Sequence, residues 1–164
     1  MIEEAFFDEH GNACPTKNGY YKVIKTYDAD GNELTYAFFG ENGKPVTTVW
    51  GFASTAFTYD VRGNVVERNY FDEAGKPTRS KDNYAGLTRA YDARGNVVEE
   101  AYFDEAGNPA ATERGYARTK LAYDERGNRV SEARTMGGVT QTTSYAFDSS
   151  NNVSSITYLS LIHI

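Results

Sequence analysis

Apolar and aromatic residues of this chain are concentrated in segments of seven or eight residues, and short polar segments rich in Gly, Asp and Asn separate them. Tyr, Phe, Val and Thr dominate the apolar segments, and these residue types favour the pleated, half-buried surface of a β-sheet. The chain contains 15 glycines, which suits a fold with many tight turns. The pattern therefore predicts an all-β fold.

The pattern repeats every 32 residues. The sequence Tyr-Asp-x-x-Gly-Asn recurs in phase with a glycine column at positions 11, 43, 75 and 107 and with an aromatic column. A constant period kept over four copies indicates a repeat architecture. The motif begins at Tyr27, Tyr59, Tyr91 and Tyr123, and the aromatic column consists of Tyr20, Phe52, Tyr84 and Tyr116.

Each unit is expected to contain two strands joined by the Tyr-Asp turn. The first strands should span residues 20–27, 52–59, 84–91 and 116–123, and the second strands 33–39, 65–71, 97–103 and 129–135. Asp favours a type I turn, and the glycine then takes a left-handed conformation, which predicts an antiparallel hairpin with a bulge. The structural turn residues are Asp28, Gly31, Asp60, Gly63, Asp92, Gly95, Asp124 and Gly127.

A shortened fifth unit indicates how successive hairpins connect. The other units have a longer connection containing Pro, which marks a break from the sheet. In the fifth unit, Gly137-Gly138 replaces that connection and predicts a two-residue hairpin, and Asn151 occupies the glycine position of the next turn. The chain then becomes a meander of about eleven strands, and sheets of that size curl or close. We expect an antiparallel β-hairpin array, either a coiled meander sheet or a β-solenoid, with long loops at one edge and short turns at the other.

The sequence leaves open which face of the sheet is buried. In the second strand of each unit, the second position is aliphatic and the fifth is nearly always Ala, as in Leu34 and Ala37. Positions of opposite parity point to opposite faces, so both faces could be partly covered.

Residues 1–159 are expected to form one repeat array that begins inside a strand. Residues 160–164 abandon the pattern, and we expect them to be a non-native tail, such as a translated sequencing adaptor. The chain would then be a metagenomic fragment of a larger repeat protein.

The Tyr-Asp-x-x-Gly-Asn turns followed by Val-Val-Glu resemble the YD repeats of bacterial rearrangement-hotspot proteins. This resemblance covers residues 2–159 and implies a spiralling β-sheet that acts as a scaffold or shell in a secreted or surface protein, with the activity in other domains. Phe6-Phe7-Asp8-Glu9-His10-Gly11 also looks like the turn of choline- and glucan-binding wall repeats. Those repeats are rich in Trp, whereas this chain contains only Trp50.

Composition and charge exclude several classes of partner. The net charge is −6, and nucleic-acid binders usually carry a basic patch. No apolar run approaches the roughly 20 residues of a membrane span. Cys14 is the single cysteine, so no disulfide forms within the chain, and the redox compartment stays open. We therefore expect no nucleic-acid and no membrane partner.

No group of residues predicts catalysis or a metal. Asp28-Ala29-Asp30-Gly31 begins like a calcium loop, but the glycine and the twelfth residue do not match an EF-hand. The acid pairs Asp72/Glu73 and Asp104/Glu105 are in turns, where a carboxylate caps backbone N–H groups. His10 and His163 have no neighbouring nucleophile to activate. The sequence predicts a non-enzyme without cofactor or metal.

The aromatic columns have two interpretations. They can form a core ladder across neighbouring strands, or a face on which sugar rings stack. The first interpretation makes the chain a non-catalytic structural module. The second makes it a glycan- or cell-wall-binding module, with ligand contacts on the long loops at Trp50, Phe52, Tyr84 and Tyr116. Self-association through open strand edges is a further possibility. The column of Arg62, Arg94 and Arg126 is expected to pair with nearby carboxylates at a solvated edge.

Overall fold

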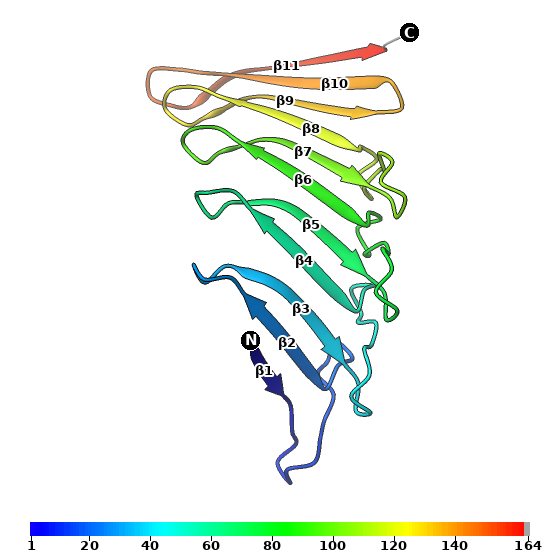
Figure 1. The fold of residues 1–164 in the computed structure, drawn as a ribbon. Helices are drawn as coiled ribbons and strands as arrows, with labels where there is room; N and C mark the ends of the chain where they lie inside the picture. Colours follow the sequence, from blue (N-terminus) through cyan, green and yellow to red (C-terminus); the bar gives the residue numbers. More distant parts are fainter. Residues whose placement is uncertain (163–164) are drawn as a thin grey trace.

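The computed structural model describes residues 1–162 and shows one open, all-antiparallel sheet (Figure 1). Its 11 strands lie in chain order, and each pairs with its sequence neighbours. No helix occurs among the described residues, so none of them forms a helix long and apolar enough to cross a membrane. The strands are β1 Ile2–Ala5, β2 Lys22–Tyr27, β3 Glu33–Phe39, β4 Ser54–Tyr59, β5 Val65–Phe71, β6 Gly86–Tyr91, β7 Val97–Phe103, β8 Arg118–Tyr123, β9 Arg129–Met136, β10 Val139–Phe147 and β11 Val153–Ile162.

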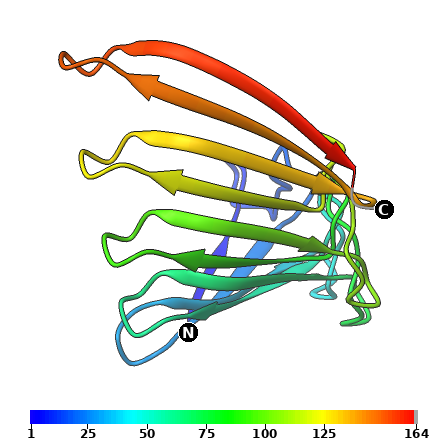
Figure 2. The same cartoon turned by 90° about the horizontal axis from the view of Figure 1, so that it is seen from above.

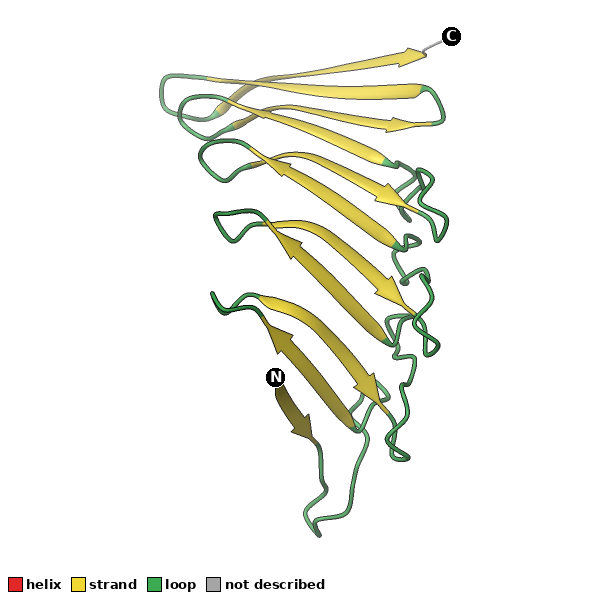
Figure 3. Ribbon diagram, in the orientation of Figure 1, coloured by secondary structure: helices red, strands yellow, loops and turns green. Residues whose placement is uncertain are grey.

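The sheet is a coiled meander, which confirms the predicted fold class. Viewed from above, the strands fan out and the sheet curls instead of remaining flat (Figure 2). This curl follows from the right-handed twist that adjacent strands accumulate. Short turns lie along one edge and long loops along the other, as predicted (Figure 3). The solenoid alternative is wrong for the described residues, because they form a single sheet.

The second strand of each unit has the predicted bounds, except that β9 extends one residue further to Met136. The first strand begins two residues later than predicted. In the first unit the Tyr20 carbonyl accepts a hydrogen bond from the Thr16 N–H at 2.8 Å, and Phe52, Tyr84 and Tyr116 make the equivalent bond. These aromatic residues therefore close a loop turn, and the regular ladder starts only after them.

The Tyr-Asp turns are three-residue hairpin loops with a bulge. In the third unit Gly95 has φ +85°, its N–H donates to the Asp92 carbonyl oxygen, and the strand register shifts just before the turn. The Asp92 carboxylate accepts hydrogen bonds from the backbone N–H groups of Arg94 and Asn96 and from the Asn96 side chain. One carboxylate thus satisfies three donors that would otherwise need water.

These hydrogen bonds make the turns sensitive to acid. The Asn96 side chain, followed by the Asn96 backbone N–H, lowers the pKa of the Asp92 carboxyl below its usual range, and Asp28, Asp60 and Asp124 are affected in the same way. A lowered folded-state pKa contributes stability that is fully present above the unfolded pKa of about 3.9 and is lost as the pH falls through the folded value.

We therefore expect the urea midpoint to decline below about pH 4. Asp92→Asn keeps an acceptor oxygen but cannot titrate, so its decline should be shallower than that of the unmodified chain. The measurement is urea unfolding followed by circular dichroism between pH 2 and 6. Parallel declines in the two proteins would show that this turn does not contribute to acid sensitivity.

Each long loop contains two tight turns, of which the sequence predicts only the first, the turn that contains the acid pairs. After β3, the Gly43 N–H donates to the Gly40 carbonyl, and the chain folds back so that Pro45 forms an isolated bridge with Phe39. A second turn follows, in which the Thr48 N–H donates to the Phe52 carbonyl at 3.0 Å. Pro thus ends the regular ladder, as predicted, but it still lies beside the strand.

The core lies on one face of the sheet, and we name it the aromatic face. Val23 pairs across strands with Phe38, and Leu87 with Tyr102, so these side chains share that face. The buried cluster consists of Val23, Phe38, Phe52, Tyr70, Tyr84, Leu87 and Tyr102. In the second strand of each unit, the aliphatic second position points to the aromatic face, as Leu34 does together with Phe38. The Ala positions, such as Ala37, point to the opposite face. The aromatic face is therefore the buried face, which the sequence alone does not decide.

The shortened fifth unit has the predicted turns. Gly137 and Gly138 both have positive φ and connect β9 to β10, and Asn151 adopts φ +68° in the last turn. β11 includes residues 160–162 of the expected tail, which pair with β10. Residues 163–164, including His163, lie outside the described residues, and the origin of the tail stays a prediction. β1 and β11 are the outer strands, and self-association through them also stays a prediction.

Candidate functional site

A continuous row of aromatic rings crosses the units on the aromatic face. Adjacent ring centroids are 4.5 to 6.1 Å apart, which is the range of favourable aromatic pairs. Where the fourth unit lacks an aromatic residue, the Arg134 guanidinium lies 5.1 Å from the Tyr116 ring centroid and continues the row. The row runs through Phe6, Tyr20, Phe38, Phe52, Tyr70, Tyr84, Tyr102 and Tyr116.

Burial changes the acidity of the tyrosines in this row and beside it. Desolvation raises the pKa of Tyr36 to about 12, and it raises the pKa values of Tyr84 and Tyr102 further. These phenols therefore stay protonated well into the alkaline range and remain able to donate hydrogen bonds. The row is therefore suited to packing and hydrogen bonding.

The tyrosine of the repeated motif connects the second and third units to the unit before each of them. The Tyr59 hydroxyl donates to the Glu33 carbonyl oxygen at 2.7 Å, and the Tyr91 hydroxyl donates to the Val65 carbonyl oxygen at 2.8 Å. Both bonds span 26 residues and end where the preceding second strand begins. This contact accounts for tyrosine at the first position of the motif, because phenylalanine cannot donate.

Tyr91→Phe should therefore lower the free energy of unfolding by about 1 kcal/mol, since the Val65 carbonyl loses its partner. Tyr158→Phe is the matched control, because Tyr158 lies on β11 and is 75% exposed. Urea unfolding of the two variants provides the measurement. Equal effects at the two positions would contradict a role for the hydroxyl in joining units.

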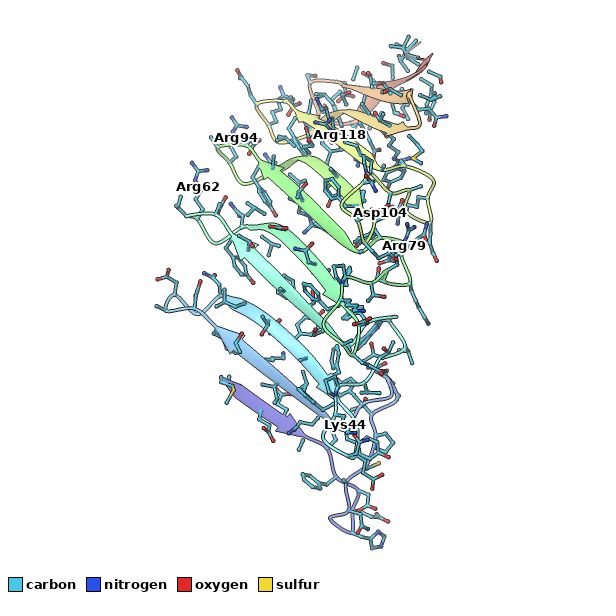
Figure 4. All side chains as sticks on the ribbon, turned by 45° about the vertical axis from the view of Figure 1, so that its right-hand side comes forward. Lys44, Arg62, Arg79, Arg94, Asp104 and Arg118 are labelled. Atoms are coloured by element: carbon cyan, nitrogen blue, oxygen red, sulfur yellow. The ribbon has the colours of Figure 1, made fainter. Side chains whose placement is uncertain are left out.

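Arg62 and Arg94 correct the prediction for the arginine column. They lie one beyond the other at the short-turn edge (Figure 4), but they do not pair with carboxylates there. The Arg62 guanidinium donates to the Ala93 carbonyl oxygen at 2.9 Å, and Arg94 donates to the Glu125 carbonyl. The Asp92 carboxylate of the next turn accepts hydrogen bonds from its own turn, so the Arg62 guanidinium binds the carbonyl oxygens there instead. The arginines thus join consecutive turns.

The long loops are joined to one another as well. The Lys81 N–H donates to the Trp50 carbonyl at 2.9 Å, and equivalent bonds join Val49 to Asn18 and Glu113 to Asp82. Arg79 and Asp104 lie at this edge (Figure 4). Arg79 forms an ion pair with Glu105 at 3.0 Å.

The acid pairs Asp72/Glu73 and Asp104/Glu105 take part in the contacts within and between the long loops. Asp72 and Asp104 accept backbone N–H bonds within their own turns, and Glu73 accepts the Thr47 N–H at 2.9 Å. Each acid therefore has a structural partner in its own turn or in the neighbouring loop.

A pocket of about 540 Å³ opens on the aromatic face between β1 and β5. Such a volume is in the range of small-molecule sites. Trp50 lies at its rim with 38% of its surface exposed, while its ring packs 5.5 Å from Phe38. The charged and polar lining includes Lys25, Glu33 and Arg68.

The four predicted ligand contacts differ in exposure. Phe52 and Tyr84 are buried, Tyr116 is half-buried and Trp50 is exposed. Trp50 and Phe52 line the pocket of about 540 Å³, whereas Tyr84 and Tyr116 line a neighbouring hollow of about 370 Å³. The structure does not bring the four together in one site, and ligand binding by them stays a prediction.

The described residues hold no group of three His, Cys, Asp or Glu side chains that could bind a metal. Cys14 is half-buried beside the Pro15 carbonyl, and His10 is exposed near Glu9. Their positions provide no activating pair for a nucleophile among residues 1–162.

Sequence reasoning missed the second turn of each long loop and the arginine in the pocket. A signal for the turn is present, because a hydroxyl residue precedes each left-handed position by three residues. The pairs are Thr16 with Gly19, Thr48 with Gly51, Ser80 with Asn83 and Thr112 with Gly115. Arg68 carries no comparable signal, since other units have Tyr36, Glu100 or Glu132 at its position.

The geometry defines a class, an open antiparallel sheet built from coupled hairpin repeats. No protein-family model and no curated protein sequence matches the chain. A solved structure described as the crystal structure of TcdB2-TccC3-Cdc42 is similar to it, with 16% sequence identity and a TM-score of 0.35. The similarity covers 85% of this chain and 9% of that chain.

Proposed function

We propose that the chain is a non-catalytic structural module, one stretch of the scaffold or shell of a larger bacterial surface or secreted repeat protein. The observation that supports this most strongly is the continuous aromatic row, which makes each unit part of its neighbours' core. Links at both edges of the sheet add to this coupling. The resemblance of the turns to YD repeats points in the same direction.

Hydrogen exchange tests this proposal. A scaffold should protect the amides of β2 to β9 to a similar degree, because coupled units open together. The expected result is one broad protected block that ends at the outer strands. Independent, weakly protected hairpins would overturn the scaffold function, because such a chain could not hold a fixed shape.

Binding of glycan or cell wall is the second candidate function, and the exposed Trp50 at the rim of the pocket favours it. A ring with an apolar face and a polar tip is suited to stacking on sugars. The test is retention of the chain on insoluble polysaccharides and peptidoglycan. Saturable retention that Trp50→Ala abolishes, with the unfolding midpoint little changed, would support binding. No retention on any matrix would leave the scaffold as the only function.

A further inference from the structure

Arg68 stands where the other units place a paired charge or an uncharged residue. Its register neighbours are Phe57 on β4 and Leu87 on β6, both apolar. At the equivalent positions, Glu100 pairs with Arg89 at 2.7 Å, and Glu132 pairs with Arg134 at 2.9 Å. Arg68 has no ion pair with any of the residues 1–162. The second unit therefore places an unpaired cation where the third and fourth units have an ion-paired carboxylate and the first unit has Tyr36.

The Arg68 guanidinium makes only some of the hydrogen bonds that it can donate. One Nη donates to the Tyr70 hydroxyl at 3.1 Å, and the Phe57 ring centroid lies 5.1 Å from Cζ. The Nε is buried and has no hydrogen-bond partner. A half-buried cation without an anion is costly, and the cation–π contact offsets part of that cost. Arg68 thus retains the capacity to bind an anion.

The pocket around Arg68 combines this charge with flat apolar surfaces. Tyr36, Trp50 and Tyr70 line it together with Arg68. Three acids, Glu4, Glu33 and Asp82, also line the pocket, and Lys25 forms an ion pair with Glu33 at 3.4 Å. The lining contains three acids and three cations, and two of the cations, Arg68 and Lys81, have no ion pair within the described residues. Lys81 is exposed, whereas Arg68 is half-buried, so Arg68 is the unpaired cation with less access to water.

We propose that this pocket binds an acidic sugar of the hexuronate class. The carboxylate of the sugar pairs with the Arg68 guanidinium, and the sugar ring lies against Trp50 at the rim. The planar guanidinium is suited to carboxylates, and hydrogen bonds between charged groups are stronger than neutral ones. This inference rests on the second candidate function and narrows it to one class of ligand.

The test titrates the full chain with a galacturonic acid trimer and with a neutral galactose trimer of the same linkage, following Trp50 fluorescence and calorimetry. We expect the acidic trimer to bind at least tenfold more tightly than the neutral one. Arg68→Gln should weaken binding of the acidic trimer at least tenfold and leave the neutral trimer unchanged. Arg62→Gln is the matched control, because Arg62 lies at the short-turn edge of the sheet and does not line the pocket. The Arg62→Gln variant should bind both trimers like the unmodified chain.

Arg68→Lys is the second variant, for use if Arg68→Gln fails to fold. Lysine keeps the positive charge but lacks the planar guanidinium, so this variant should also bind the acidic trimer more weakly. Equal affinity for both trimers, or no effect of either Arg68 variant, would overturn the acidic-sugar assignment while leaving glycan binding in place. Absence of binding by both trimers, together with no retention on polysaccharide, would overturn both. Binding of benzoate with no binding of either trimer would show a carboxylate site that does not recognise sugars, and it would overturn the assignment as well.

Discussion

Phe52→Ala should lower the free energy of unfolding by about 3–5 kcal/mol, the largest effect that we expect from a single side chain. The Phe52 ring is 5% exposed and contacts rings from three strands or loops, with its centroid 4.5 Å from that of Tyr70 and 6.1 Å from that of Phe38. Its removal would leave a cavity in the middle of the aromatic row, and flanking strands cannot close it without losing register.

Phe7→Ala is the control for this prediction, because the same side chain is removed where 63% of it is exposed. The free energy of unfolding should then change by no more than about 0.5 kcal/mol. Urea unfolding, followed by far-ultraviolet circular dichroism and Trp50 fluorescence, measures both variants. Similar losses for the two would show that the aromatic row is not the core of the array.

Gly51→Ala should have the second largest effect, a loss of about 2–4 kcal/mol in the free energy of unfolding. Gly51 has φ +89°, where an L side chain costs about 1–2 kcal/mol. A Cβ there would also lie 3.2 Å from the Arg79 carbonyl oxygen and 3.3 Å from the Lys81 nitrogen. These are backbone atoms of the next loop, so they cannot move away without breaking the bond between Lys81 and Trp50.

Gly115→Ala separates the cost of the positive φ from the cost of the contact with the next loop. Gly115 occupies the equivalent turn with φ +83°, but a Cβ at this position would meet no atom of another loop within 4 Å. It should show only the conformational cost of about 1–2 kcal/mol. Thermal and urea unfolding of both variants test the difference. Equal losses would mean that contact between consecutive loops does not stabilise the array.

The period of the chain predicts most of the fold. The 32-residue spacing and the Asp-x-x-Gly turns determine the number of strands, their order and the bounds of the second strand in each unit. These features are local, because a turn places neighbouring segments antiparallel regardless of what covers them. The start of the first strand is less predictable, since the Tyr20 carbonyl is used by a loop turn rather than by the ladder.

The buried face and the contacts between units are harder to predict, because they depend on pairing across strands. The Tyr91 hydroxyl and the Arg62 guanidinium reach backbone carbonyls 26 and 31 residues away, and no sequence pattern marks those carbonyls. The pocket is less predictable still. Arg68 is informative only when its register neighbours, Phe57 and Leu87, are known to be apolar.

Removal of one complete unit tests the central claim, that the array is built from equivalent and coupled repeats. Deletion of residues 65–96 joins Asn64 to Val97 and restores the motif. The shortened chain should unfold in one cooperative transition, with a urea m-value lower by about a fifth, because the surface exposed on unfolding decreases in proportion. Deletion of residues 65–97 removes one residue more, turns every following side chain to the opposite face and should abolish the transition. Loss of cooperative unfolding in the in-phase deletion, or its survival in both deletions, would show that the repeats are not equivalent and coupled.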